Sequence, residues 1–493
     1  MSSLEKPVSA AELLAVSGLA LATIAVVGWR IGYPALLLDE HTSLAFTQES
    51  WSDLFGRLWA ADTHRPIFYA LLKAWIGVAG MDLATMRMLG ALFAAASVVV
   101  VWAIGRVLGG RDVALMAAAL SVCSPMFIAQ ARELRMYPLF TFALLLAVLA
   151  LALILCKGGT NRRWLGLAAA AAAAFYAHSI GLLFFPLAGA LVLGLCLAGL
   201  APRRLIFGLA GSALLWLVLI SPGLQPMLFH SRATLADFWI PHPSLGWVWS
   251  QMAGAYPYPT LSKPLIMLAL LGGLAAAWQQ DRRVFWILLT MTFATPLMLW
   301  GGSYLRPVLI VRVFVWTTLI GGIVLAFALC TLRPAWRWPG LGILVALQLL
   351  ALRPFYPSEP QQTWIDRMGP ELQAFDLQQD VLVLGLVSFE DNLRWNHPEL
   401  RDADMRAFSH GDRRVPYAAV LWSDHLDRDQ AANMSLGHGQ VWIIWEIEPT
   451  IPVPVADRVE PALKMIRART RPVRQEVYGP LLLEVRTPEA PPG

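Results

Sequence analysis

The sequence predicts a polytopic α-helical membrane protein with a small soluble domain at its carboxyl end. Of the 493 residues, 57% are hydrophobic and only 14% are charged, and the mean hydropathy is +0.57. Soluble domains carry about 25% charged residues, so this composition excludes a purely soluble protein. Long apolar runs recur up to residue 352, whereas the rest of the chain is rich in charge.

Eleven apolar segments approach the roughly 20 residues that a helix needs to cross a bilayer. They lie at residues 11–29, 85–105, 113–129, 136–156, 164–178, 181–200, 205–222, 264–279, 284–300, 308–330 and 338–352. The apolar run 67–80 is shorter, and we expect it to lie along the membrane interface. The first segment is not followed by an A-x-A-like cleavage site, which predicts a retained anchor.

Short basic loops predict the orientation. With a cytoplasmic amino terminus, every second loop is basic, as the positive-inside rule requires. The inner loops then carry Arg106 and Arg111; Lys157, Arg162 and Arg163; Arg203 and Arg204; Arg282 and Arg283; and Arg333 and Arg337. A basic nucleic-acid-binding face is not indicated, because these charges are spread over separate loops. The four cysteines lie in apolar stretches, which gives neither a disulfide framework nor a cysteine-based zinc site.

Two domains follow from this pattern. Residues 1–352 form the membrane domain, which includes a long first outer loop at residues 30–84. Residues 353–493 contain strand-like runs at 381–386, 441–445 and 481–485. We expect them to form a small α/β domain of about 140 residues on the outer face, and nothing in it resembles a catalytic site.

The charged stretch Arg132-Glu133-Leu134-Arg135 lies between two apolar segments. An ionised side chain at membrane depth costs roughly 2.5–3.5 kcal/mol on insertion scales, so this stretch lies at a water interface or lines a polar cavity. Arginine suits phosphate because its planar fork binds two oxygens, and Tyr137 can add a hydroxyl donor. The alternative is a helix-end ion pair in which arginine extends to the interface.

Asp39-Glu40 is the second acidic feature, in the first outer loop. Two adjacent carboxylates are not expected to face the same way, so one can act as a general base while the other orients it or the acceptor. The alternative is an acidic surface loop.

Three further positions are candidates. His64, which precedes Arg65 and Pro66, can contact a phosphate or cap the helix that follows. His178 ends an apolar segment, where a structural role is the more common one. Arg312 lies about one turn inside an apolar segment, where it is costly unless it meets an anion or a carboxylate.

A metal site is not assigned by these residues. His178 and the Asp39-Glu40 pair could together coordinate a divalent cation, but no H-x-E or E-x-x-H spacing supports one. The sequence therefore predicts no specific cofactor, and binding of a divalent cation remains an alternative.

Taken together, the motifs resemble the GT-C superfamily of membrane glycosyltransferases, in particular bacterial relatives of protein O-mannosyltransferases and lipopolysaccharide core glycosyltransferases. Residues 131–139 closely match that family's Ala-Arg-Glu-x-Arg-Met-Tyr-Pro-Leu motif, and Leu38-Asp39-Glu40 looks like its acidic motif. Residues 64–69 are similar to its His-Pro-Pro-Leu-Tyr-Tyr element, with Arg65 in place of the first proline. Residues 176–178 are like its Tyr-Thr-His element. Arg306-Pro307 with Arg312 is like its Arg-Pro…Arg-Tyr stretch, with Val313 in place of tyrosine.

The resemblance implies inverting transfer from an undecaprenyl-phosphate-linked sugar to a glycan, lipid or protein acceptor, at the periplasmic side of a bacterial inner membrane. Asp39 would be the base, supported by Glu40. The donor phosphate would be bound by Arg132, Arg135, Tyr137, Arg312 and His64, and the substrate also by Glu133, His178 and Arg65.

Two other functions fit parts of the pattern. A flippase or transporter for a lipid-linked substrate would also use intramembrane arginines, although the charges gather at one face and no paired broken helices stand out. A non-catalytic scaffold would leave Asp39-Glu40 and the arginines unexplained.

Overall fold

The computed structural model describes residues 7–56, 66–233, 243–256, 262–305, 308–385, 388–400, 402–407, 439–446 and 463–489. The chain divides into two compact units. The membrane unit comprises Met1–Gly32, His64–Met227 and Ile240–Ser358, and the sheet unit comprises Tyr33–Thr63, Leu228–Trp239 and Glu359–Gly493. The sheet unit thus includes a part of the first loop, while the predicted domain division after residue 352 stays a prediction.

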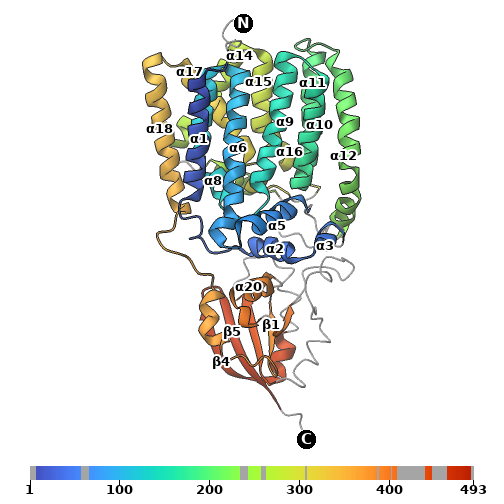
Figure 1. Cartoon of the computed structure of the whole chain (residues 1–493), viewed down its shortest axis with the longest axis vertical. Helices are drawn as coiled ribbons and strands as arrows, with labels where there is room; N and C mark the ends of the chain where they lie inside the picture. The colour runs from blue at the N-terminus through green and yellow to red at the C-terminus, as the bar shows by residue number, and fades with distance from the viewer. Residues whose placement is uncertain are drawn as a thin grey trace. The chain divides into compact units, whose positions relative to one another are not determined.

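The membrane unit is a helical bundle (Figure 1). Its elements are α1 (Ala10–Gly28), α5 (Ile67–Ala79), α6 (Leu83–Gly109), α7 (Arg111–Val122), α8 (Pro125–Ala131), α9 (Tyr137–Lys157), α10 (Asn161–Ala177), η1 (Ser179–Leu183), α11 (Phe184–Leu197), most of α12 (Leu205–Ala233), α13 (Leu245–Ala255), α14 (Lys263–Gln280), α15 (Arg282–Leu289), η3 (Thr290–Ala294), α16 (Thr295–Gly302), η4 (Val311–Val313), α17 (Trp316–Thr331), α18 (Pro334–Leu352) and η5 (Arg353–Phe355).

Local sequence explains where several of these helices begin. The side chains of Ser9, Asp82, Thr160 and Asp281 each accept a hydrogen bond from a backbone N–H in the first turn of the helix that follows. Such N-caps satisfy donors that have no partner inside the helix. They fix the starts of α1, α6, α10 and α15.

Seven of the described helices are long and apolar enough to cross a membrane, and the bent pair α7–α8 gives up to eight. The predicted membrane class is therefore confirmed, whereas the predicted count of eleven spans stays a prediction. Helix α5 is apolar and 13 residues long, as the sequence indicates for the run 67–80.

Two segments differ in detail from the predicted spans. The segment 113–129 is two helices, α7 and α8, that meet at an angle of 57°. Ser124 has an extended ψ of 111° and precedes Pro125, because the residue before a proline is pushed out of the helical region. The segment 308–330 becomes α-helical only at Trp316, so Arg312 lies in the 3-10 turn η4, before the α-helix instead of inside it.

A close approach of α6 and α8 places the charged loop. A Cβ atom on Gly90 of α6 would lie 2.3 Å from the carbonyl oxygen of Ala131. Any larger residue at position 90 would displace α8, and Ala131 directly precedes Arg132. Glycine at this position therefore helps to set where the loop that follows α8 begins.

The sheet unit contains a five-stranded sheet in the order β2-β1-β3-β5-β4. Its strands are β1 (Val381–Leu384), β2 (Asp404–Ala407), β3 (Val441–Glu446), β4 (Thr470–Tyr478) and β5 (Leu481–Pro488). β1 pairs in parallel with β2 and β3, and β5 pairs in antiparallel with β3 and β4. The three predicted strand runs are thus present, and the predicted α/β domain is confirmed.

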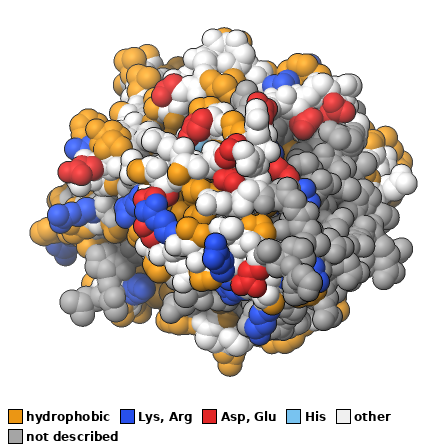
Figure 2. Space-filling view, turned by 90° about the horizontal axis from the view of Figure 1, so that it is seen from below, with side chains coloured by type: hydrophobic (Ala, Val, Ile, Leu, Met, Phe, Trp, Pro, Cys, Tyr) orange, Lys and Arg blue, Asp and Glu red, His pale blue; other side chains and the backbone are white. Residues whose placement is uncertain are grey.

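Helices of the sheet unit include α2 (Leu38–Gln48), α3 (Trp51–Phe55), η6 (Asp366–Met368), α19 (Gly369–Leu372), α20 (Ser388–Asn396) and η7 (Pro398–Leu400). Helix α2, from the first loop, packs against α20, from the carboxyl-terminal part. The N–H of Gln361 donates to the carbonyl of Tyr33 at 2.7 Å, which ties the same two parts of the chain together. Figure 2 shows a face on which described acidic and basic side chains are mixed, as expected of a surface in water.

Candidate functional site

The two carboxylates of the acidic motif face different ways on α2. Asp39 is exposed, whereas Glu40 is fully buried and its Oε2 accepts a hydrogen bond of 2.8 Å from the N–H of Leu37. Both lie in the first helical turn, where the helix dipole favours negative charge. The geometry separates an accessible carboxylate from one that holds the start of the helix.

His41 follows directly and is a residue that the sequence reasoning missed. Its side chain is 1% exposed, and its Nδ1 lies 3.1 Å from the carbonyl oxygen of Leu37. The sequence could have indicated it, because it lies beside two acids in a polar segment. Its contact with Leu37 makes it a further candidate to orient α2.

In the membrane unit, Arg132 ends α8 and is 4% exposed. Its Nη1 donates to the carbonyls of Val27 and Trp29, both at 2.7 Å, and its Nη2 donates to Arg30 at 3.0 Å. These carbonyls lie at and just past the end of α1, where helices leave acceptors without partners. Arg132 therefore caps α1.

The guanidinium of Arg132 also lies 4.2 Å from the centre of the Tyr356 ring. That tyrosine donates to the carbonyl of Val26 at 2.6 Å, so it approaches the same end of α1. Arg87 of α6 adds a second buried guanidinium, 1% exposed, which donates to Ile31 at 2.9 Å. Sequence reasoning missed Arg87, although a charged residue near the start of an apolar helix could have indicated a functional position.

The other charged side chains of the loop that follows α8 are also buried or partly buried. Arg135 is 5% exposed and Glu133 is partly buried. Tyr137 starts α9, and its ring lies 5.8 Å from the ring of His178. The structure thus brings together two residues that the sequence analysis took from separate motifs.

His178 is held in a defined orientation between α10 and η1. Its Nδ1 accepts a hydrogen bond of 3.2 Å from the N–H of Ile180, and its ring also packs on Phe140 at 5.3 Å. With Nδ1 as the acceptor, the neutral ring carries its proton on Nε2.

The remaining predicted site residues lie in η4 or outside the described residues. Arg312 is partly buried in η4, next to Val311, whose N–H donates to Gln251 of α13 at 2.7 Å. His64, Arg65 and Arg306 lie outside the described residues. Within the described ranges no group of three His, Cys, Asp or Glu side chains is arranged to hold a metal ion.

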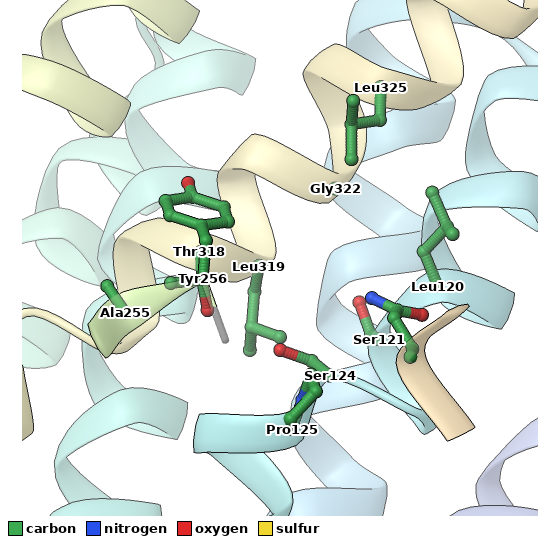
Figure 3. Close-up of a pocket in the computed structure, with 11 residues that line it drawn as sticks. Leu120, Ser121, Ser124, Pro125, Ala255, Tyr256, Thr318, Leu319, Gly322 and Leu325 are labelled. Atoms are coloured by element: carbon green, nitrogen blue, oxygen red, sulfur yellow. The ribbon is translucent and has the colours of Figure 1, made fainter. Parts of the chain in front are cut away.

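A small cavity lies where the α7–α8 break meets α17 and α18 (Figure 3). The hydroxyls of Ser121 and Thr318 both line it, and they donate to the carbonyls of Ala117 and Val315. The cavity leaves about 10 Å³ for the centre of a water molecule. That is room for roughly one water and not for a sugar or a phosphate.

The family comparison matches the middle of the membrane unit. A family model described as dolichyl-phosphate-mannose-protein mannosyltransferase matches residues 63–225. That range includes the charged loop after α8 and His178. A sequence search of the curated proteins finds no match.

Solved structures share the fold over nearly the whole chain. ArnT from Cupriavidus metallidurans bound to undecaprenyl phosphate is similar over 96% of this chain and 97% of its own, with a TM-score of 0.64 and 11% identity. The oligosaccharyltransferase AglB from Archaeoglobus fulgidus, in complex with an inhibitory peptide and a dolichol-phosphate, is similar over 96% of this chain and 74% of its own, with a TM-score of 0.56 and 11% identity. The partial family match and the shared fold bear out the predicted resemblance, and the chain is a multi-pass membrane protein with the fold of these structures.

Proposed function

We propose that this protein is a glycosyltransferase that moves a sugar from a polyprenyl-phosphate-linked donor, such as an undecaprenyl-phosphate sugar, to an acceptor in the cell envelope. The observation that carries the proposal is a fold shared over 96% of the chain with ArnT, whose structure holds undecaprenyl phosphate. The family match over residues 63–225 supports the same reaction class.

Asp39 is our general base. It is exposed on α2, where an acceptor hydroxyl can reach it. It would take the proton of the acceptor hydroxyl as that oxygen attacks the anomeric carbon. The bond from the anomeric carbon to the phosphate oxygen breaks, the lipid phosphate leaves, and the configuration inverts. Glu40 would support this step by holding the start of α2.

The leaving phosphate needs positive charge and hydrogen-bond donors. Arg135 is our principal phosphate-binding residue, assisted by Tyr137, Arg312 and His64. Arg132 would contribute its charge from the end of α1, because its N–H groups already hold backbone carbonyls. His178 would present Nε2 to the substrate beside Tyr137, and Glu133 and Arg65 would contact the sugar.

The test is a transfer assay on the full chain in lipid nanodiscs, with a panel of undecaprenyl-phosphate sugars and membrane extract as the acceptor. Asp39→Asn should lower the release of undecaprenyl phosphate by about 10²- to 10⁴-fold, the usual contribution of a general base, while the donor still binds. Glu49→Gln, which removes an acid just past the other end of α2, is the matched control and should keep full turnover.

Two results would contradict the proposal. If Asp39→Asn turns over like the wild type, Asp39 is not the base. If wild type binds the donor and moves it between leaflets without ever releasing lipid phosphate, a flippase is the better assignment.

A further inference from the structure

A second cavity, in the membrane unit, lies between α11 and the segment formed by α15 and η3, and its volume is about 370 Å³. α11 lines it with Leu187, Leu191 and Gly194, at the spacing that brings side chains to one face of a helix. Trp286 and Thr290, four residues apart on the facing segment, line the other wall. Ligand pockets occupy roughly 300–1,000 Å³, so this cavity is large enough for a small ligand or an acyl chain.

Two local features keep the cavity open. A Cβ atom added at Gly194 would have no heavy atom within 4 Å, so the wall is recessed there. On the facing side, Thr290–Ala294 is a π-helical segment, a wider turn that is frequent at functional sites. The lining is apolar apart from Thr290, which suits a hydrocarbon chain.

Arginines lie close in sequence to lining residues of both walls. Leu200, which also lines it, is followed by the exposed Arg203 and Arg204. On the other wall the exposed Arg282 lies four residues before Trp286, on the same face of α15. The guanidinium of Arg282 lies 5.0 Å from the centre of the Trp278 ring, and a stacked guanidinium keeps its in-plane N–H groups for an anion.

Arg203 and Arg204 lie in a different place from the contact of Tyr137 with His178. His178 lies before the start of α11, whereas the arginines follow its end. The 14 residues of α11 separate the two ends by about 20 Å. Arg203 and Arg204 therefore lie far from His178, at the opposite end of the helix.

We propose that the α11–α15 cavity binds an anionic phospholipid of the surrounding bilayer, with one acyl chain against Leu187, Leu191 and Trp286 and its phosphate at Arg203, Arg204 and Arg282. Basic residues between membrane helices recognise anionic headgroups by charge and hydrogen bonding. The inference does not depend on the proposed transfer reaction.

The test measures lipid retention by the full chain with native mass spectrometry, after exchange into detergent with phosphatidylglycerol or phosphatidylcholine as the probe. Wild type should retain phosphatidylglycerol in preference. Gly194→Phe, which fills the recess, and the combined Arg203→Gln, Arg204→Gln and Arg282→Gln variant should each lower that retention by about tenfold, the loss expected when roughly 1.4 kcal/mol of binding free energy is removed.

Gly166→Phe is the matched control, because Gly166 on α10 is equally open and lies away from the cavity. It should retain the lipid as wild type does. Equal retention of phosphatidylcholine, unchanged retention in both cavity variants, or recovery of a polyprenyl phosphate in place of the phospholipid would each overturn the proposal. The arginine variant changes exposed residues only, so the test holds even if Gly194→Phe does not fold.

Discussion

A buried arginine of the membrane unit and a buried glutamate of the sheet unit are held in different ways. In the membrane unit, Arg132 is 4% exposed, and its contacts within the described chain are with neutral groups, three backbone carbonyls and the Tyr356 ring. In the sheet unit, Glu484 is fully buried between Arg467 and Arg486, so its charge is cancelled. A cation held by dipoles keeps its field, whereas an ion pair does not. The first arrangement suits an anionic ligand, and the second suits stability alone.

The largest expected effect is on the sheet unit. Glu484→Gln would leave Arg486 buried without its acidic partner, which costs roughly 3–5 kcal/mol. Hydrogen exchange of β3 and β5 in the full chain should accelerate strongly. Glu476→Gln, on the exposed strand β4, is the control and should change stability by less than about 0.5 kcal/mol. Unchanged protection in Glu484→Gln would mean that the pair is not stabilising.

The same pair predicts how stability depends on pH. Burial alone would raise the pKa of Glu484, but the hydrogen bond and charge of Arg467, with help from Gln475 and Arg486, hold that pKa below its ordinary value. Since the folded pKa is depressed, the stabilisation is complete above the ordinary glutamate pKa of about 4.3 and is lost as pH falls through the folded value. Protection of β5 in wild type should therefore fall in acid, and Glu484→Gln should lack that step.

The next largest effect is expected on lipid-phosphate release, at Arg135 of the membrane unit. Arg135→Gln should lower lipid-phosphate release by about 10²- to 10³-fold, the loss typical of removing one group that stabilises transition-state charge. Arg162→Gln, an exposed arginine at the start of α10, should leave turnover unchanged. An Arg135→Gln protein with normal turnover would remove Arg135 from the phosphate site.

Substitutions of Arg132 can distinguish the effect of its charge from the effect of its hydrogen bonds. Arg132→Lys keeps the positive charge but cannot reproduce three hydrogen bonds, so it should lose about 1–3 kcal/mol of stability and retain more turnover than Arg132→Gln. Thermal unfolding and the transfer assay together measure the two losses. Equal turnover in the lysine and glutamine variants would show that the field of Arg132 does not act on the reaction.

Sequence patterns predicted much of this arrangement where the information is local. Hydrophobic runs predicted the membrane helices, short strand-like apolar runs predicted β1, β3 and β5, and adjacency predicted that Asp39 and Glu40 face apart. The break between α7 and α8 could also have been predicted, because Ser124-Pro125 interrupts the run. Its continuously apolar composition nevertheless favours a single span.

The partners of the buried charges could not be predicted. Arg132 binds carbonyls more than 100 residues earlier in the chain, and backbone acceptors have no sequence signature. The packing of α2 on α20 joins segments from the two ends of the chain for the same reason. Hydropathy predicts a continuous helix around Arg312 because it does not distinguish the short 3-10 turn η4 from the α-helix that begins at Trp316.

The smallest effect compares two histidines of equal exposure, His178 in the membrane unit and His397 in the sheet unit, each 8% exposed. His178 packs its ring on Tyr137, and His397 lies 3.1 Å from Glu399 through its Nδ1. His178→Asn keeps a polar side chain that can accept from Ile180 N–H but removes the ring and Nε2, so turnover should fall by several-fold with a stability loss below about 1 kcal/mol. His397→Asn should change stability by a similar amount and leave turnover unaltered. If the two variants have the same turnover, the Tyr137–His178 contact serves packing alone and His178 takes no part in the reaction.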